Sequence, residues 1–228
     1  MNLVVLLGVT LLLLAHLSSA KRALIIVDVQ NDFLPGGSLA VSEADKVVPV
    51  FNKLRKEAHW DKIFQTQDWH VEKHVSFVNN HEGAEVFSTV KLEDGTEQRM
   101  WPAHCVQNTK GAEFHPDLIV EETDEKNQTV DSYSGFFDNN KASQTELHEK
   151  LQEENITEVY IGGVALDVCV MSTCVHAVEL GYKTYVIEDA SKGLSKESVD
   201  AALAKLVSLG VTVVNSSDII MPSNKDEL

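Results

Sequence analysis

The chain has 228 residues, of which 43% are hydrophobic, and 35 acidic against 19 basic side chains give a formal net charge of −16. This length and composition predict one globular domain rather than a disordered chain. The acidic balance argues against a phosphate-binding surface, so we expect no nucleic-acid partner. Three cysteines do not make a disulfide framework. A Cys105–Cys174 bridge stays open, and at least one thiol is left unpaired.

The N-terminus carries an apolar run from Leu3 to Leu17, followed by the small residues Ser18 and Ala20. This pattern predicts a signal peptide over residues 1–20 that is cleaved after Ala20. Because no Lys or Arg precedes the run, an uncleaved membrane anchor is the rival interpretation. The run is short for a span of about 20 residues, which favours cleavage and no stable membrane insertion afterwards.

The middle of the chain alternates strand patterns with helix patterns. We expect strands at 23–29, 62–66, 118–120, 158–163, 183–187 and 211–214, and helices at 42–59 (beginning at Ser42), 143–154, 168–180 and 195–209. Residues 69–116 are predicted to be irregular, and so long an irregular stretch is usually functional. The alternation predicts an α/β three-layer sandwich in one domain over residues 21–221. Its mostly parallel sheet has about six strands, with helices on both faces.

The C-terminal tail, residues 222–228, ends in Lys225-Asp226-Glu227-Leu228, a retention signal of the endoplasmic reticulum. Together with the signal peptide it predicts a lumenal protein and a KDEL-type retention receptor as partner. Three glycosylation sequons, at Asn127, Asn155 and Asn215, agree with that compartment. A homo-oligomer is left open.

Reactive side chains follow four of the predicted strands, at Asp28, at Asp68 with His70, at Lys126 and at Cys169. Sites in open α/β sheets form outside the carboxyl ends of the strands, so we expect these groups to meet. Cys169 also begins a predicted helix, where free N–H groups stabilise a thiolate. The plain alternative for this cysteine is a buried small hydrophobe.

A metal site is expected at Asp68 and His70, whose side chains point the same way in an extended segment, with His104 as a third ligand. Carboxylate and imidazole ligands suit zinc, manganese or iron. For His74 and His81 a solvated loop histidine is the favoured interpretation. We disfavour Cys105 as a ligand, because adjacent residues point apart in an extended chain.

Two carboxylates lie close together, one at the end of the first predicted strand and one just after it. Asp28 sits within an apolar strand pattern, where a charge is costly unless it is used or paired, so a functional role is expected. For Asp32 we expect a carboxylate that caps the following loop. Lys126 is a weaker candidate, because the acidic run before it reads as an exposed loop.

Five segments, in this order and spacing, resemble the nicotinamidases of the isochorismatase-like hydrolase superfamily: residues 27–33, 68–70, 101–105, 131–136 and 163–170. The resemblance covers essentially residues 22–215. It implies a catalytic triad of Cys169, Asp28 and Lys126.

The same resemblance implies three further sets of groups. The metal ligands are Asp68, His70 and His104. An oxyanion hole is formed by the N–H groups of Ala165 and Cys169, with a cis peptide between Ala165 and Leu166. The substrate ring is held by Phe33, Trp101, Tyr133 and Leu166. One departure from the family pattern is Asn127, where glycine usually follows the lysine. Because Asn127 heads a sequon beside the expected site, we expect it to be unglycosylated or to point outward.

The activity implied is a metal-dependent amidase. It hydrolyses nicotinamide to nicotinate and ammonia through a cysteine thioester and serves NAD salvage, with zinc the expected metal and manganese or iron open. A related amidase acting on a carbamoyl or ureido compound is the nearest alternative, although those relatives generally lack the metal ligands. An isochorismatase proper is a less favoured alternative, because its chemistry does not use the cysteine. A catalytically silent lumenal binding or redox protein, with Cys169 oxidised or paired with Cys174, is the alternative from another class.

Overall fold

The structure is a computed structural model that describes residues 20–93, 95–129 and 132–220. The predicted signal peptide, apart from Ala20, and the tail with the predicted retention signal lie outside these residues. Within the described part of the chain, no helix combines the length and the apolar character needed to cross a membrane.

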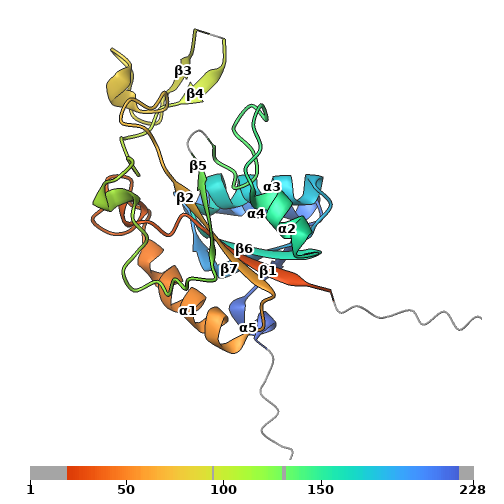
Figure 1. Cartoon of the computed structure of the whole chain (residues 1–228). Helices are drawn as coiled ribbons and strands as arrows, with labels where there is room; N and C mark the ends of the chain where they lie inside the picture. The colour runs from red at the N-terminus through yellow and green to blue at the C-terminus, as the bar shows by residue number, and fades with distance from the viewer. Residues whose placement is uncertain (1–19, 94, 130–131, 221–228) are drawn as a thin grey trace, which may run out of the picture.

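A single six-stranded parallel sheet forms the centre of the molecule (Figure 1), with strand order β5-β2-β1-β6-β7-β8. The strands are β1 (Arg22–Val27), β2 (Lys62–Asp68), β5 (Glu125–Thr129), β6 (Glu158–Val164), β7 (Lys183–Lys192) and β8 (Thr212–Val214). The predicted parallel sheet of about six strands is confirmed. Because all strands are parallel, their carboxyl ends lie at one edge of the sheet, where the candidate residues follow them.

Helices cover both faces of the sheet, which confirms the three-layer sandwich. One face carries α1 (Val47–Glu57) and α5 (Ser216–Ile219), and the other carries α2 (Leu147–Glu153), α3 (Met171–Glu179) and α4 (Lys196–Ser208). The strand residues alternate between two cores: Leu24 and Ile26 belong to the first, Ile25 and Val27 to the second. This alternation is the period-two side-chain pattern of a strand buried on both faces.

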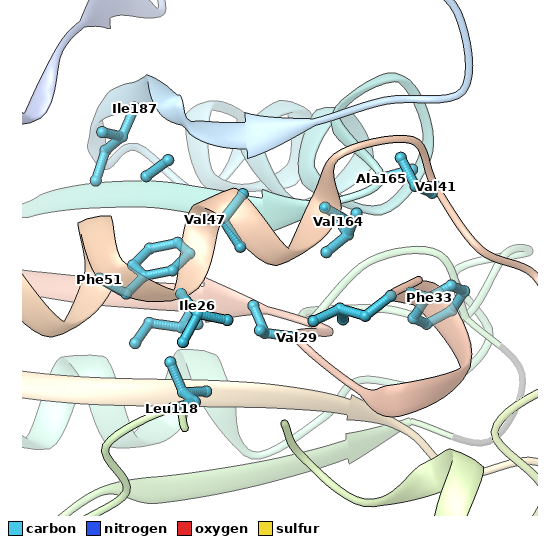
Figure 2. Close-up of a cluster of buried hydrophobic side chains, with 14 of the residues drawn as sticks. Ile26, Val29, Phe33, Val41, Val47, Phe51, Leu118, Val164, Ala165 and Ile187 are labelled. Carbon is cyan, nitrogen blue, oxygen red and sulfur yellow. The ribbon is translucent and has the colours of Figure 1, made fainter. Parts of the chain in front are cut away.

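The first core runs from beneath α1 to the carboxyl edge of the sheet (Figure 2). Val47 and Phe51 of α1 lie above Ile26, and the cluster continues through Val29 to Phe33. The base of the candidate site is therefore continuous with the hydrophobic core, so its backbone is held by packing on the sheet.

The helix α1 begins five residues later than the sequence pattern indicates. A 3-10 turn at Ala44–Lys46 precedes it, and Ser42 does not cap it. The position of Pro49 explains the difference, because proline is tolerated in the first turn of a helix and disrupts its interior. By contrast, α4 begins where expected, with the side chain of Ser195 accepting a hydrogen bond from the Ser198 N–H.

The predicted third strand at 118–120 is wrong. The chain here is tied to α1, since Asn52 donates from Nδ2 to the Asp117 carbonyl and accepts from the Ile119 N–H. The strand that joins the sheet is β5, a few residues further on. Lys126 therefore lies inside a strand and not after one.

Residues 69–116 are mostly irregular, as expected, but they contain a small hairpin of β3 (Thr89–Lys91) and β4 (Glu97–Arg99). The hairpin stands apart from the main sheet (Figure 1). Short turns of 3-10 helix occur within this segment at Val78–Asn80 and Lys110–Ala112, and before it at Asn31–Phe33. The segment 69–116 places the hairpin and the histidines beyond the carboxyl edge of the sheet.

Candidate active site

Cys169 lies in a π-helical turn, Leu166–Val170, between the end of β6 and the start of α3. The N–H groups of Val168 and Val170 both donate to the Ala165 carbonyl at 3.1 Å, which closes this turn. The cis peptide is Val164–Ala165, one bond earlier than predicted. The Ala165–Leu166 peptide, at the start of the turn, is trans, as peptide bonds almost always are.

Asp28 follows β1 directly, at a backbone φ of 51°, and is 3% exposed. Its Oδ1 accepts a 2.5 Å hydrogen bond from the Thr66 hydroxyl, and its N–H donates to the same hydroxyl at 3.2 Å. Carboxylate oxygens of Asp28 and Asp68 and the sulfur of Cys169 lie within 4.8 Å of one another. The predicted meeting of Asp28 with Cys169 is thus present in the fold.

Burial dominates the titration of this pair. It raises the pKa of Asp28 well above the usual range, and the negative charge of Asp68 adds to the effect. The pKa of the Cys169 thiol is also raised, by burial first and by the Asp28 charge second, while a hydrogen bond from the Ala165 backbone lowers it. A carboxylate whose pKa is raised is a stronger base toward the neighbouring thiol.

The predicted metal ligands form one buried cluster. The Oδ2 atom of Asp68 lies 3.2 Å from Nε2 of His70 and 3.7 Å from Nε2 of His104. The Nδ1–H of His104 donates to the Pro102 carbonyl at 2.7 Å, which turns Nε2 toward the cluster. Burial raises the pKa of Asp68, but the two histidines outweigh it and hold that pKa below the usual range. One carboxylate and two imidazoles fit a divalent transition metal.

The other polar candidates near this cluster take different places. His74 is buried, so the expectation of a solvated loop histidine is wrong for this residue. Its ring lies 4.3 Å from the His70 ring, and its Nδ1 shares a hydrogen bond with the Ser76 hydroxyl. His81 bonds the Val75 carbonyl. Asp32 caps its loop as expected, because it accepts hydrogen bonds from the N–H groups of Ser38 and Cys105.

A single pocket joins the cysteine to the metal cluster. Of the predicted ring-binding residues, Phe33, Trp101 and Tyr133 line it, and the Trp101 Nε1–H donates to the Tyr133 hydroxyl at 2.9 Å. The remaining lining residues are Leu39, Val41, Asp68, His70, His74, Ser76, Gln98, His104, Ser132, Asn139, Ala165, Val168, Cys169 and Leu194. The wall is mostly apolar and aromatic, so it suits a small flat ring.

Leu166 does not line this pocket, which corrects its predicted role. Its side chain is 1% exposed, and the turn contributes Ala165, Val168 and Cys169 instead.

Lys126 is not brought to the pocket, contrary to the triad that the resemblance implies. Its side chain is exposed, and Nζ lies 6.0 Å from the centre of the Phe114 ring. Strand register explains the placement: Thr66, which holds Asp28, pairs with Asn127, so Asn127 and Thr129 face inward and Lys126 faces outward.

The sequon residue Asn127 and the three cysteines are all buried. Asn127 is buried, and its Nδ2 donates to the Gly135 carbonyl at 2.7 Å, so the side chain points inward and not outward. Cys105, Cys169 and Cys174 are all free and buried, with no Cys105–Cys174 bridge.

Sequence reasoning missed the residues that hold the acidic groups. Thr66 holds Asp28, and the Thr129 hydroxyl donates to Oδ1 of Asp68 at 3.3 Å. The Gln30 side chain accepts from the Asp68 N–H. The polar run Gln65–Asp68 inside a strand buried from Phe64 onward was a usable signal, because buried polar side chains need partners.

Comparison with known proteins places this geometry in a family. The isochorismatase domain model matches residues 22–218. A nicotinamidase of Acinetobacter baylyi is 41% identical over 207 residues, covering 87% of this chain and 94% of its own. The solved structure of an Acinetobacter baumannii nicotinamidase/pyrazinamidase has a TM-score of 0.82 at 40% identity, over 88% of this chain and 99% of that one.

A third similar protein bears on the metal cluster. The pyrazinamidase of Pyrococcus horikoshii, solved in complex with zinc, has a TM-score of 0.70 at 35% identity and covers 86% of this chain and 99% of its own. With a domain model and relatives that match nearly its whole length, the chain belongs to the isochorismatase family.

Proposed function

We propose that the protein is a nicotinamidase, which hydrolyses nicotinamide to nicotinate and ammonia. The observation that carries the proposal is one pocket in which Cys169 lies beside the Asp68–His70–His104 cluster, with the buried Asp28 carboxylate within 4.8 Å of the Cys169 sulfur. The similar proteins of Acinetobacter, named for this activity, support the substrate. The aromatic wall of Phe33 and Trp101 suits a pyridine ring.

The chemistry follows from the positions of Cys169 and Asp28. Asp28 takes the thiol proton, and the thiolate attacks the amide carbon of the substrate. The N–H of Ala165, which already bonds the Cys169 sulfur, and the N–H of Cys169 stabilise the developing oxyanion. Asp28 returns the proton to the leaving ammonia. It then activates a water that hydrolyses the thioester, which releases nicotinate and regenerates the thiol.

A divalent metal, with zinc as our proposal, would be held by Asp68, His70 and His104. When bound it would act as a Lewis acid that accepts the pyridine nitrogen and so orients the ring. The zinc complex of the Pyrococcus pyrazinamidase supports this choice. The Nδ1–H bond from His104 to Pro102 holds that ring with Nε2 toward the site before any ligand arrives.

Purified protein incubated with nicotinamide tests the proposal, with ammonia and nicotinate measured together. We expect turnover of nicotinamide, its loss after chelation and its return with added zinc. Parallel assays with carbamoyl and ureido compounds address the nearest alternative. Turnover of those compounds without turnover of nicotinamide would show a related amidase instead.

We also propose that the protein resides in the lumen of the endoplasmic reticulum and is recognised by a KDEL-type receptor. Support comes from the two chain ends in the sequence and from the exposed sequon residues Asn155 and Asn215. Deleting the last four residues should shift the protein from the cell to the medium. A glycosidase-sensitive mass shift lost in Asn155→Gln or Asn215→Gln, but not in Asn127→Gln, would sharpen the test, because Asn127 is buried.

A further inference from the structure

We propose that Asp167 is a positioning residue that ties the cysteine turn to the next loop of the pocket wall. It lies two residues before Cys169, in the π-helical turn. Its Oδ1 accepts a 3.0 Å hydrogen bond from the Leu194 N–H, and its Oδ2 accepts a 2.5 Å bond from the Ser198 hydroxyl. Leu194 and Cys169 both line the pocket, so one carboxylate fixes two of its walls relative to each other.

The backbone brings these two segments together at the end of the sheet. The last residues of β7 pair with the end of β6, with Gly163 opposite Ser191 and Val164 opposite Lys192. Ser191 Oγ also accepts from the Gly163 N–H and donates to the Ile187 carbonyl. The chain then passes through Gly193 to Leu194, which places the loop beside the turn that carries Cys169.

The loop at Gly193 and the turn that carries Asp167 lie too close together for any side chain at residue 193. A Cβ on Gly193 would lie 2.7 Å from Oδ1 of Asp167 and 2.4 Å from a methyl of Val199. Glycine therefore permits the approach of the loop to the carboxylate. This tight fit is an observation separate from the two hydrogen bonds, and it points to the same docking of loop on turn.

The first turn of α4 completes the arrangement. Ser195 caps the helix by accepting from the Ser198 N–H, and the two serine hydroxyls lie 2.8 Å apart. The single Ser198 hydroxyl proton goes to Asp167, so the Ser195 hydroxyl donates to Ser198. A carboxylate at the N-terminal turn of a 13-residue helix is also favoured by the helix dipole.

The consequence for catalysis is precise placement of the sulfur. Asp167 contacts no reacting atom in this arrangement; it acts through the turn and through Leu194. Small displacements of a nucleophile can cost about 100-fold in rate. We therefore expect Asp167→Ala to lower kcat/KM for nicotinamide by about 10- to 100-fold. Asp167→Asn keeps an acceptor for the Leu194 N–H and a polar partner for Ser198, and should retain most of the activity.

The test measures kcat, KM, the melting temperature and the rate at which iodoacetamide alkylates Cys169, followed on its peptide by mass spectrometry. The variants are Asp167→Ala, Asp167→Asn and Ser198→Ala, with Asp200→Asn as the control, since Asp200 is exposed on the same helix and pairs with Lys196. Ser198→Ala removes one of the two bonds and should change kcat and alkylation in the same direction as Asp167→Ala, by less.

The inference rests on the proposed function, because it takes Cys169 as the nucleophile. Absence of nicotinamide turnover in the unmodified protein overturns the proposed function, whatever the variants do. With turnover present, the inference is overturned if Asp167→Ala or Ser198→Ala lowers only the melting temperature and leaves kcat and alkylation per folded molecule unchanged. If Asp167→Ala does not fold, Ser198→Ala decides by the same measurements.

Discussion

The two sides of the pocket contrast in how their reactive residues are presented. On the β6 side, Cys169 stands on a turn closed by its own hydrogen bonds, above a strand paired on both edges. On the β5 side, Lys126 belongs to an edge strand paired only with β2, and its side chain faces away from the site. The turn sets the direction of a side chain that follows a central strand. Within an edge strand, the register of pairing alone decides which face a side chain points to, and a slip of one residue moves the side chain to the opposite face.

The largest expected effect is on the β6 side, from removal of the nucleophile. Cys169→Ala should reduce nicotinamide turnover by about 10⁴-fold or more, because a thioester can no longer form. Metal content, measured on the purified variant, should be unchanged, since the ligands lie on other segments. Cys174→Ala is the matched control, a buried cysteine of α3 outside the pocket, and it should remain active. Substantial turnover by Cys169→Ala contradicts the mechanism.

The second effect concerns the backbone that leads to the cysteine. Gly163 has a φ of 136°, and a Cβ there would lie 2.0 Å from the Val27 carbonyl oxygen. We expect Gly163→Ala to destabilise the fold by more than about 3 kcal/mol, through backbone strain combined with overpacking. Urea unfolding measures the loss. Gly181→Ala is the control: it also has a positive φ but open space around it, so only the backbone strain of about 1–2 kcal/mol is expected.

The third effect lies between the two sides, at the threonine that holds Asp28. The Thr66 hydroxyl bond lowers the pKa of Asp28 against the larger effect of burial, so its loss should raise that pKa further. Asp28 then stays protonated to higher pH, and the acidic limb of kcat/KM should move to higher pH in Thr66→Val. Activity at neutral pH should fall about 10-fold, as for a lost hydrogen bond to a charged group.

The control for this experiment is Thr66→Ser, which keeps the hydroxyl and should restore both the rate and the pH profile. An unchanged acidic limb in Thr66→Val would show that Asp28 does not govern it.

The smallest effect is expected on the β5 side. Because Lys126 lies outside the pocket, Lys126→Ala should change kcat/KM by no more than about 2-fold, as for other surface substitutions. Gln128→Ala, the next outward-facing residue of β5, is the matched control. A 10³-fold loss in Lys126→Ala alone would show that the strand turns its lysine inward during turnover. In that case the contrast between the two sides would no longer hold.

The part of the site that the sequence predicted consists of residues that lie at the ends of well-patterned central strands. Asp28 and Cys169 follow continuous apolar runs, and such runs are buried whatever the details of packing. Asp68 and His70 share a face because of the two-residue period of extended chain. Two of the predictions that failed, the strand at 118–120 and the placement of Lys126, concern segments with weak patterns, and the place of 118–120 depends on contacts with the distant residue Asn52.

By itself, the amino-acid sequence determined the α/β class, the carboxyl-edge location of the site, and the grouping of Asp28, Cys169 and the three metal-ligand candidates, because hydrophobic periodicity and residue spacing are local properties of the chain. Only the tertiary structure decided the register of β5, the support of Asp28 by Thr66, and the link from Asp167 to Leu194 and Ser198. These features join residues 27 or more positions apart, and their geometry is set by packing and hydrogen bonding between elements, which no local pattern encodes.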